Sequence, residues 1–244
     1  MKLLNKIMQH LAEERMHMTL LDPEKQGSDD TGEMALRAAR SGTDAIMIGG
    51  STGVTQERLD RAIAAIRARV ELPVILFPRG AGALSSKADG VYFMSLLNSR
   101  SRRFLIGEQV RGAPVVRALG IEPLPLGYIV VEPGMKVGDV GMADPLRRND
   151  LDAAVAYALC AQYLGMRFVY LEAGSGAPEP VPAEMVSAVK EAIEVPLIVG
   201  GGVRMPEQAR KLAHAGADIL VTGTLVETGS SAELKRVIRA FKSA

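Results

Sequence analysis

The chain has 244 residues, of which 48% are hydrophobic and 23% charged, and its formal net charge at pH 7 is +1. This length is typical of one (β/α)8 domain, so we expect a single domain over residues 1–244. The apolar content excludes a disordered chain. The near-neutral charge provides no overall field that would attract nucleic acid or an anionic membrane, so any anion must be bound by a local site.

Cysteine content and the N-terminal residues indicate where the protein works. Cys160 is the only cysteine, which excludes an intramolecular disulfide and a multi-cysteine zinc site and favours a reducing cytoplasm. Residues 1–14 mix basic and acidic side chains and do not resemble a signal peptide. The apolar stretch 151–164 is too short to span a bilayer. We expect a soluble cytoplasmic protein with at most peripheral membrane contact.

Strand and helix patterns alternate along most of the chain. Apolar residues at helical spacing before residue 14 predict a short helix that closes the bottom of a barrel. Predicted strands cover 16–21, 45–48, 73–77, 90–94, 124–131 and 168–171, and two more begin at 197 and 219. Predicted helices cover 28–42, 55–70, 98–112, 151–164, 182–193, 205–215 and 231–241. This alternation predicts an α/β fold, a (β/α)8 TIM-type barrel with parallel strands.

Two connections depart from the regular alternation. Residues 78–89 lie between the third and fourth strands, and a whole crossover needs at least about 10–12 residues. The third helix is therefore predicted to be missing or reduced to a stub, which leaves a gap in the outer wall of the barrel. Residues 132–150 form a long, polar, glycine-bearing segment, which is typical of a lid or binding loop.

The last two strands both end in glycine-rich turns. One ends at residues 200–202, which are all glycine, and the other at Gly223 and Thr224. Without a Cβ, such turns let main-chain N–H groups converge on phosphate oxygens, and barrels of this type commonly bind phosphate there. These positions predict a phosphate site. The alternative is that the glycines only tighten the turns between strand and helix.

Other polar side chains are predicted at the same end of the barrel. Asp22 and Ser51 follow the first two strands, and both carry hard oxygen donors suited to Mg²⁺. Glu172 precedes the small-residue turn 173–176, where a carboxylate can orient or deprotonate a substrate hydroxyl. Tyr170 faces the same rim if strand alternation holds. Alternatively, Asp22 caps a turn before Pro23, Ser51 caps a helix, and Glu172 and Tyr170 are ordinary barrel residues.

The remaining candidate side chains carry weaker predictions. His10, His17 and His214 all fall away from the expected site, which argues against histidine acid–base catalysis and a histidine metal centre. Lys25 follows Asp22 closely enough to reach a diphosphate, and Arg204 follows the glycine cluster. A solvated surface role is the default prediction for both.

An ordered set of motifs resembles a known family. The motifs are Thr19-Leu-Leu-Asp-Pro-Glu-Lys25, Gly42-Thr-Asp-Ala-Ile-Met-Ile-Gly-Gly-Ser-Thr-Gly53, Phe93-Met-Ser-Leu-Leu-Asn-Ser99, Tyr170-Leu-Glu-Ala-Gly-Ser-Gly-Ala-Pro178, the Gly200 cluster and Val221-Thr-Gly-Thr224. Over nearly its whole length the chain closely resembles the geranylgeranylglyceryl phosphate synthase family, in its archaeal branch. The resemblance implies Mg²⁺-dependent transfer of a geranylgeranyl group from geranylgeranyl diphosphate to the 3-hydroxyl of sn-glycerol 1-phosphate. This reaction forms the first ether bond of archaeal membrane lipids.

The resemblance also implies roles for individual residues. Asp22 and Ser51 match the Mg²⁺ positions of the family. Combined with this reaction, the chemistry of the strand ends makes Glu172 the predicted catalytic residue, which would orient the attacking hydroxyl. The glycerol 1-phosphate site matches Tyr170, Leu171, Glu172, Ala173, Gly174, Ser175, Gly176, Gly201, Gly202, Gly223 and Thr224. Some relatives have a lysine where this chain has Leu20, and Lys25 is a candidate substitute. Family members replace the third helix and are often dimers or hexamers, so a homo-oligomer is expected.

A prenyl chain needs an apolar groove, which we place beside residues 92–97, where the third helix is missing. On the barrel pattern alone, the main alternative is a phosphate-binding isomerase or lyase. Such enzymes need a paired acid and base, and the predicted strand ends offer few candidates. A non-catalytic prenyl-diphosphate binding protein is a third interpretation, and Mg²⁺-dependent turnover would separate it from an enzyme.

Overall fold

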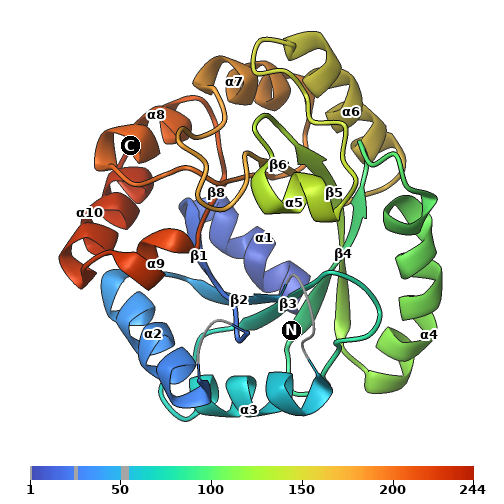
Figure 1. The fold of residues 1–244 in the computed structure, drawn as a ribbon. Helices are drawn as coiled ribbons and strands as arrows, with labels where there is room; N and C mark the ends of the chain where they lie inside the picture. The colour runs from blue at the N-terminus through green and yellow to red at the C-terminus, as the bar shows by residue number, and fades with distance from the viewer. Residues whose placement is uncertain (1, 25–26, 51–54) are drawn as a thin grey trace.

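The structure, a computed structural model, describes residues 2–24, 27–50 and 55–244. Eight parallel strands form a closed barrel in chain order, and β8 pairs with β1 (Figure 1). The strands are β1 (Met16–Leu21), β2 (Ala45–Gly50), β3 (Val74–Pro78), β4 (Gly90–Leu96), β5 (Glu122–Val130), β6 (Phe168–Glu172), β7 (Leu197–Gly200) and β8 (Ile219–Thr222). The predicted TIM-type barrel is confirmed.

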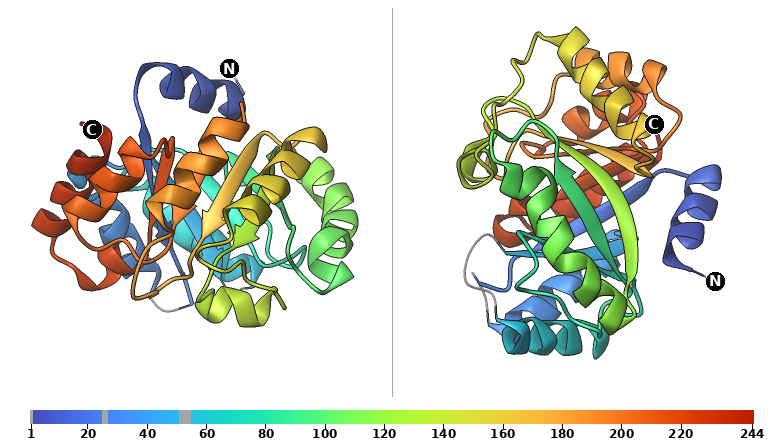
Figure 2. Two further views of the ribbon diagram at one scale, coloured as in Figure 1. Left: turned by 90° about the horizontal axis from the view of Figure 1, so that it is seen from above. Right: turned by 90° about the vertical axis from the view of Figure 1, so that its right-hand side faces the viewer.

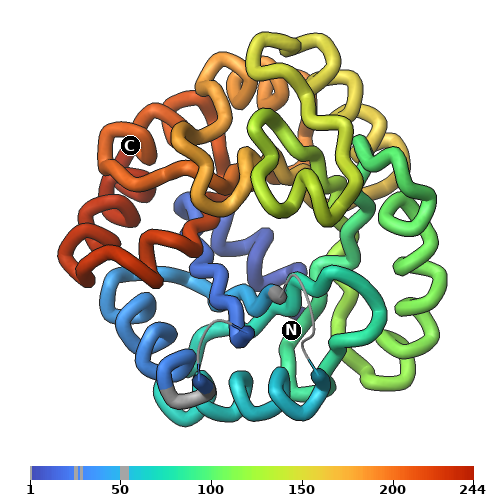
Figure 3. The backbone as a smooth tube through the Cα atoms, viewed as in Figure 1, coloured from blue at the N-terminus to red at the C-terminus, as the bar shows by residue number. Residues whose placement is uncertain are grey.

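Helices surround the barrel on its outer face (Figure 1). They are α2 (Ser28–Ser41), α3 (Gln56–Arg67), α4 (Glu108–Leu119) after the π-helical turn η1 (Arg103–Gly107), α6 (Leu151–Tyr163), α7 (Ala183–Ala192), α8 (Pro206–His214) and α10 (Ser231–Lys242). No helix lies between β3 and β4, and Figure 3 shows this connection as an open loop. The missing third helix is therefore confirmed. Within the described residues, no helix has the length and apolar character required to cross a membrane.

One end of the barrel is closed by α1 (Leu3–Glu13), as the sequence predicts. Leu3 and Ile7 are buried against residues of the barrel interior. The Glu122 carboxylate accepts hydrogen bonds from the N–H groups of Leu3 (2.5 Å) and Leu4 (3.3 Å), which have no partner inside the helix. Figure 2 shows α1 and the short helix α5 (Met135–Val140) at opposite ends of the molecule. The end on the side of α5 is therefore the one that α1 does not cover.

Strand alternation divides the core into two layers. Met18, Met47 and Tyr92 belong to a cluster that fills the barrel. Leu21 and Ile46 belong to a second cluster that packs between the strands and the helices. Side chains of one strand point alternately into these layers, so only every second residue faces the barrel interior and its mouth.

The predicted helix 98–112 is wrong in its bounds. The helical segment begins at Arg103 and continues to Leu119, with Pro114 inside α4. The Asn98 side-chain amide donates hydrogen bonds to the carbonyls of Val130 (2.8 Å) and Asp144 (2.9 Å), which holds its chain in a loop. Local helical spacing does not reveal such long-range bonds.

Short helices also lie inside two segments predicted as loop or turn. The loop 132–150 contains α5, and a five-residue helix, α9 (Thr224–Thr228), follows β8 directly. Both are shorter than two turns of periodic sequence, so their apolar pattern is too short to recognise.

His17 lies in a buried polar cluster beside the barrel, away from its mouth. Its ring nitrogens lie 2.9 Å from Thr43 Oγ1 and 3.0 Å from Thr222 Oγ1. Burial, assisted by the positive charge of Lys242, lowers the pKa of His17 to about 3. The ring is therefore neutral at pH 7 and serves as a hydrogen-bonding core residue.

This burial predicts a pH-dependent stability. Unfolded His17 binds a proton near pH 6.5 and the folded ring only near pH 3, so its contribution is complete above pH 6.5 and decreases as the pH falls. Between pH 7 and pH 5 the parent should lose about 2 kcal/mol more unfolding free energy than His17→Gln. Urea unfolding of both proteins at the two pH values measures this difference. An equal loss in both would show that His17 is not the titrating group.

Candidate functional site

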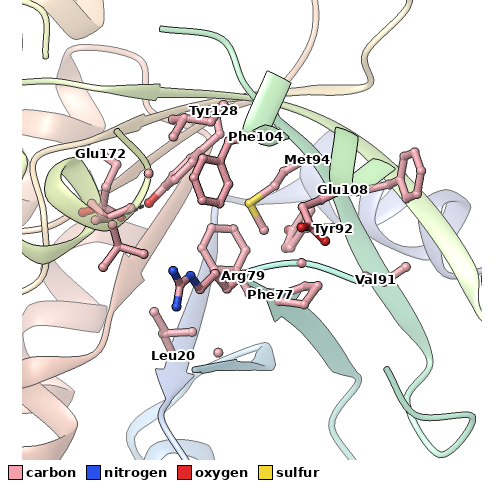
Figure 4. A pocket seen from close by; sticks show the side chains of 18 of the residues that line it. Leu20, Phe77, Arg79, Val91, Tyr92, Met94, Phe104, Glu108, Tyr128 and Glu172 are labelled. Carbon is pink, nitrogen blue, oxygen red and sulfur yellow. Dashed lines mark hydrogen bonds between the residues drawn. The ribbon is translucent and has the colours of Figure 1, made fainter. Parts of the chain in front are cut away.

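Two connected pockets occupy the open end of the barrel. The larger, about 260 Å³, extends from the strand ends to the space between the β3–β4 connection and α4 (Figure 4). The smaller, about 40 Å³, lies against the turns that follow β6, β7 and β8. The two pockets share Leu20, Glu172, Ser175 and Gly223 as lining residues. Groups bound in the two pockets would therefore meet at Glu172.

The smaller pocket is enclosed by glycine turns in a left-handed conformation. Gly201 and Gly202 have φ angles of +83° and +75°, and Gly174 and Gly176 after β6 have +101° and +82°. A Cβ on Gly201 would lie 2.5 Å from the Glu172 carboxylate. The glycines therefore tighten these turns, which was the alternative prediction for them. They also leave space where the turns meet. This pocket is the predicted phosphate site, and its position matches the phosphate site of many such barrels.

Glu172 closes β6 and is the carboxylate common to both pockets. Its side chain is buried, with Oε1 accepting a hydrogen bond from the Gly174 N–H (2.7 Å) and Oε2 from the Tyr128 hydroxyl (3.3 Å). Burial raises the pKa of Glu172, and the hydrogen bonds from Tyr170, Gly174 and Tyr128 oppose this rise. A carboxylate with a raised pKa is a stronger proton acceptor than an exposed one.

Aromatic rings support Glu172 from inside the barrel. The ring centroid of Tyr128 lies 5.0 Å from that of Tyr170 and 5.3 Å from that of Phe77. Burial raises the pKa of both tyrosines well above 10, so their hydroxyls remain neutral donors. A Cβ on Gly200 would overlap the Tyr170 hydroxyl. Tyr170 thus lies beneath the phosphate turn, and the glycine there leaves it space.

Other predicted glycerol-phosphate residues differ in how they face this pocket. Ser175 and Thr224 line it, with their hydroxyl oxygens 3.1 Å apart. The side chains of Leu171 and Ala173 belong to the cluster between the strands and the helices. Only their main-chain atoms are therefore available to a ligand.

Asp22 lies at the end of β1 and lines the larger pocket. Its Oδ1 accepts a hydrogen bond from the Glu24 N–H (3.0 Å), which is the turn-capping role that the sequence also allowed. Among the described residues, Oδ2 has no hydrogen-bond partner. Asp22 therefore retains an oxygen suited to Mg²⁺, whereas Ser51 and Lys25 lie outside the described residues.

Across the described ranges, one group of three histidine, cysteine or carboxylate side chains is close enough together to hold a metal ion. It consists of His10, Glu14 and Asp44. His10 and Glu14 belong to α1 or its end, and the Lys242 ammonium lies 2.8 Å from Asp44 Oδ1. This group therefore lies at the closed end of the barrel and already contains a cation. Asp22 would hold an ion only together with other oxygen ligands, such as phosphate oxygens and water.

Basic residues at the pocket show what sequence reasoning missed. Arg79 follows β3, Lys136 lies on α5, and both line the larger pocket with Asp22. A basic residue directly after a strand was a usable signal for Arg79, whereas Lys136 depends on the unpredicted α5. Arg204 is exposed, as expected of a surface residue, and its guanidinium also donates to the carbonyls of Ala177 (2.7 Å) and Gly176 (3.0 Å), which holds the β6 turn.

Comparison with known proteins gives the family. The model of the PcrB family matches residues 9–243. The chain belongs to the PcrB family. It is 53% identical over 230 residues to the geranylgeranylglyceryl phosphate synthase of Thermococcus gammatolerans, covering 94% of this chain and 91% of the relative. It is 57% identical over 212 residues to that of Methanothrix thermoacetophila, covering 86% and 83%.

A solved structure of a similar protein superposes along the entire chain. The crystal structure of (S)-3-O-geranylgeranylglyceryl phosphate synthase from Thermoplasma acidophilum, in complex with sn-glycerol-1-phosphate, has a TM-score of 0.97 and 43% identity and covers 100% of both chains. A tryptophan synthase structure from Mycobacterium tuberculosis matches with a TM-score of 0.61 at 14% identity, over 98% of this chain and 96% of its own, which shows a shared fold alone. The barrel of this PcrB family chain is therefore that of its relatives.

The contacts of Glu172 predict how its pKa responds to mutation. Tyr128→Phe removes a hydrogen bond that favours the ionised carboxylate, so the pKa of Glu172 should rise further above 4.5. NMR titration of carboxyl-¹³C-labelled glutamate measures the shift, with Glu172→Gln to assign the signal. Tyr157→Phe on α6 is a matched control and should leave the titration unchanged. A lowered or unchanged pKa in Tyr128→Phe would contradict the role given to Tyr128.

Proposed function

We propose that this chain catalyses the Mg²⁺-dependent transfer of a geranylgeranyl group from geranylgeranyl diphosphate to the 3-hydroxyl of sn-glycerol 1-phosphate. The observation that carries the proposal is the pair of pockets that meet at Glu172, one long and largely apolar, the other lined by glycine turns. The relatives named geranylgeranylglyceryl phosphate synthase, and the related structure bound to sn-glycerol-1-phosphate, support it.

The smaller pocket suits the acceptor. Main-chain groups of the turns at Gly201 and Gly223, with the hydroxyls of Ser175 and Thr224, would bind its phosphate. An anchored phosphate leaves the glycerol hydroxyl directed toward Glu172, because both pockets meet there. Such anchoring converts an encounter into a positioned reaction.

The larger pocket suits the donor. Asp22, Arg79 and Lys136 line its mouth and would face the diphosphate, with the two cations opposing its negative charge. Beyond them the lining becomes apolar, with Phe77, Phe104 and Val116 among its residues. Burial of a prenyl chain against this surface supplies binding energy in proportion to the apolar area covered.

Asp22 is the described residue that would hold Mg²⁺, with Ser51 as the second predicted ligand. Bound there with the diphosphate, Mg²⁺ would neutralise charge that develops on the leaving group. Dependence on the ion is part of the proposal.

The bond changes follow from this arrangement. The bond between C1 of the prenyl group and the diphosphate oxygen breaks, and its electron pair leaves with the diphosphate. A new bond forms between C1 and the glycerol oxygen, and the hydroxyl proton passes to the Glu172 carboxylate. The raised pKa of Glu172 favours its acceptance of this proton. The aromatic and aliphatic lining limits access of water, which would otherwise compete as the nucleophile.

The oligomeric state and the cytoplasmic location stay predictions. Exposed apolar side chains on η1 and α4, including Ile106 and Val110, are consistent with an interface between copies of the chain.

The proposed activity is tested with labelled sn-glycerol 1-phosphate, a series of prenyl diphosphates, and reactions with and without Mg²⁺. Asp22→Asn should lose Mg²⁺-dependent turnover, and Glu172→Gln should lower kcat by about 10²–10⁴-fold while still binding glycerol phosphate. Product formation is followed by chromatography and acceptor binding by calorimetry. Absence of ether product from every donor would refute the enzyme and favour a binding protein. Parent-like behaviour of both mutants would refute the site.

The groove assignment predicts a change in donor length. Gly112 on α4 lines the apolar part of the larger pocket, and a Cβ there would make ordinary contact with Ala81 at 3.6 Å. Gly112→Phe should therefore fill the groove and shift preference toward shorter prenyl diphosphates, while Gly112→Ala serves as the matched control. Relative kcat/KM across the donor series measures the shift. An unchanged preference in the phenylalanine variant would place the prenyl chain elsewhere.

A further inference from the structure

The outer wall of the donor groove lacks the helix that normally covers a strand pair in this fold. It is formed instead by the β3–β4 connection on one side and by α4 on the other. Gly80, Ala81 and Leu84 line the groove from the connection, and Glu108 and Val116 line it from α4. What holds these two sides together determines how tightly the groove can enclose a chain.

Glu108 joins the two sides directly. It is the first residue of α4, and its side chain is only 7% exposed. Oε2 accepts a hydrogen bond from the Ala81 N–H (2.9 Å), and a Cβ on Gly80 would lie 2.5 Å from the same oxygen. The connection therefore rests on the carboxylate, and a glycine at position 80 permits this approach. Figure 4 shows Glu108 on the side of the groove near Met94 and Val91, away from Glu172.

The second carboxylate oxygen is held by two arginines. Oε1 accepts a hydrogen bond from Arg103 Nε (2.7 Å) and lies 3.2 Å from Arg111 Nη1. Both arginines belong to the same helical segment as Glu108, η1 followed by α4. Burial alone would raise the pKa of Glu108, but the Ala81 N–H and these arginines outweigh it and lower the pKa. An ionised carboxylate with both oxygens occupied is fixed in orientation, and its bond to Ala81 is charge-assisted.

The Glu108 carboxylate lies apart from the predicted catalytic residue. It lines the groove together with Leu84 and Val116, on the side away from Glu172. A short donor would be held by the mouth alone, whereas a long donor would extend past Glu108.

We propose that Glu108 is a positioning residue for donor length: it binds residues 80–81 to α4 and so closes the groove around the distal part of a long prenyl chain. This inference rests on the proposed function. Loss of the Glu108 carboxylate would let the β3–β4 connection move away from α4, which would expose the distal part of the prenyl chain to water. The penalty should therefore fall on long donors and spare short ones.

The decisive variant is Glu108→Gln, which keeps the side-chain size but removes the charge. Its KM for geranylgeranyl diphosphate should rise about tenfold, with less than about a twofold change in the KM for ten-carbon geranyl diphosphate or for sn-glycerol 1-phosphate. Glu57→Gln is the matched control, because Glu57 is an exposed α3 glutamate that pairs only with Arg61 among the described residues, at 3.8 Å. It should behave as the parent for both donors.

Hydrogen exchange of the Ala81 amide tests the contact without requiring turnover. Exchange should be slow in the parent and in Glu57→Gln, and at least about tenfold faster in Glu108→Gln, because the charged acceptor is lost. Unchanged exchange would overturn the proposal, as would an equal rise in KM for both donors. If the parent makes no ether product, the proposed function fails, and direct binding of the two diphosphates still decides whether Glu108 discriminates by length.

Discussion

The burial of the Glu172 carboxylate at the rim of the barrel is the constraint around which the site is arranged. A buried carboxylate is unfavourable unless its oxygens are hydrogen-bonded, and here the Gly174 N–H and the Tyr128 hydroxyl fulfil that need. These partners come from the turn after β6 and from β5. Gly201, on the turn after β7, approaches so closely that a Cβ would contact the carboxylate. One charged group thus fixes how three neighbouring strand ends meet.

The larger pocket depends on the helix that is missing between β3 and β4. The barrel is closed by α1 at its other end, so a long apolar chain cannot pass along the barrel axis, and the larger pocket extends instead into the side wall. Omission of the helix between β3 and β4 supplies that route. A polar contact bridges the gap that results in the outer wall, because Glu108 holds the connection to α4 with a charge-assisted hydrogen bond.

Sequence reasoning succeeded where local chemistry decides the structure. The strands follow from apolar runs, the missing helix follows from a connection too short to contain one, and the tight turn after β7 follows from its glycines, two of which the structure shows to be left-handed. It failed where distant contacts decide, as at Asn98, whose side chain holds a predicted helical segment in a loop. Tyr128 and Glu108 were missed for the same reason: their positions appear ordinary until β6 and the β3–β4 connection are placed beside them. The metal role of Asp22 was predicted from its oxygen donors at a strand end and again from the family resemblance, and among the described residues its Oδ2 has no hydrogen-bond partner.

The two pockets differ in what constrains their shape, and this difference bears on specificity. The acceptor pocket is formed by turns joined to paired strands, with glycines that leave no space for larger side chains, so its shape is fixed by the barrel itself. The proposed donor groove is bounded by a loop and a helix outside the barrel, and neither Gly112 nor Glu108 belongs to a strand. Under the proposed function, recognition of the phosphate would therefore be tied to the stability of the fold, whereas the accepted prenyl length could change without disturbing the phosphate site. A single barrel can in this way keep one acceptor and vary its donor.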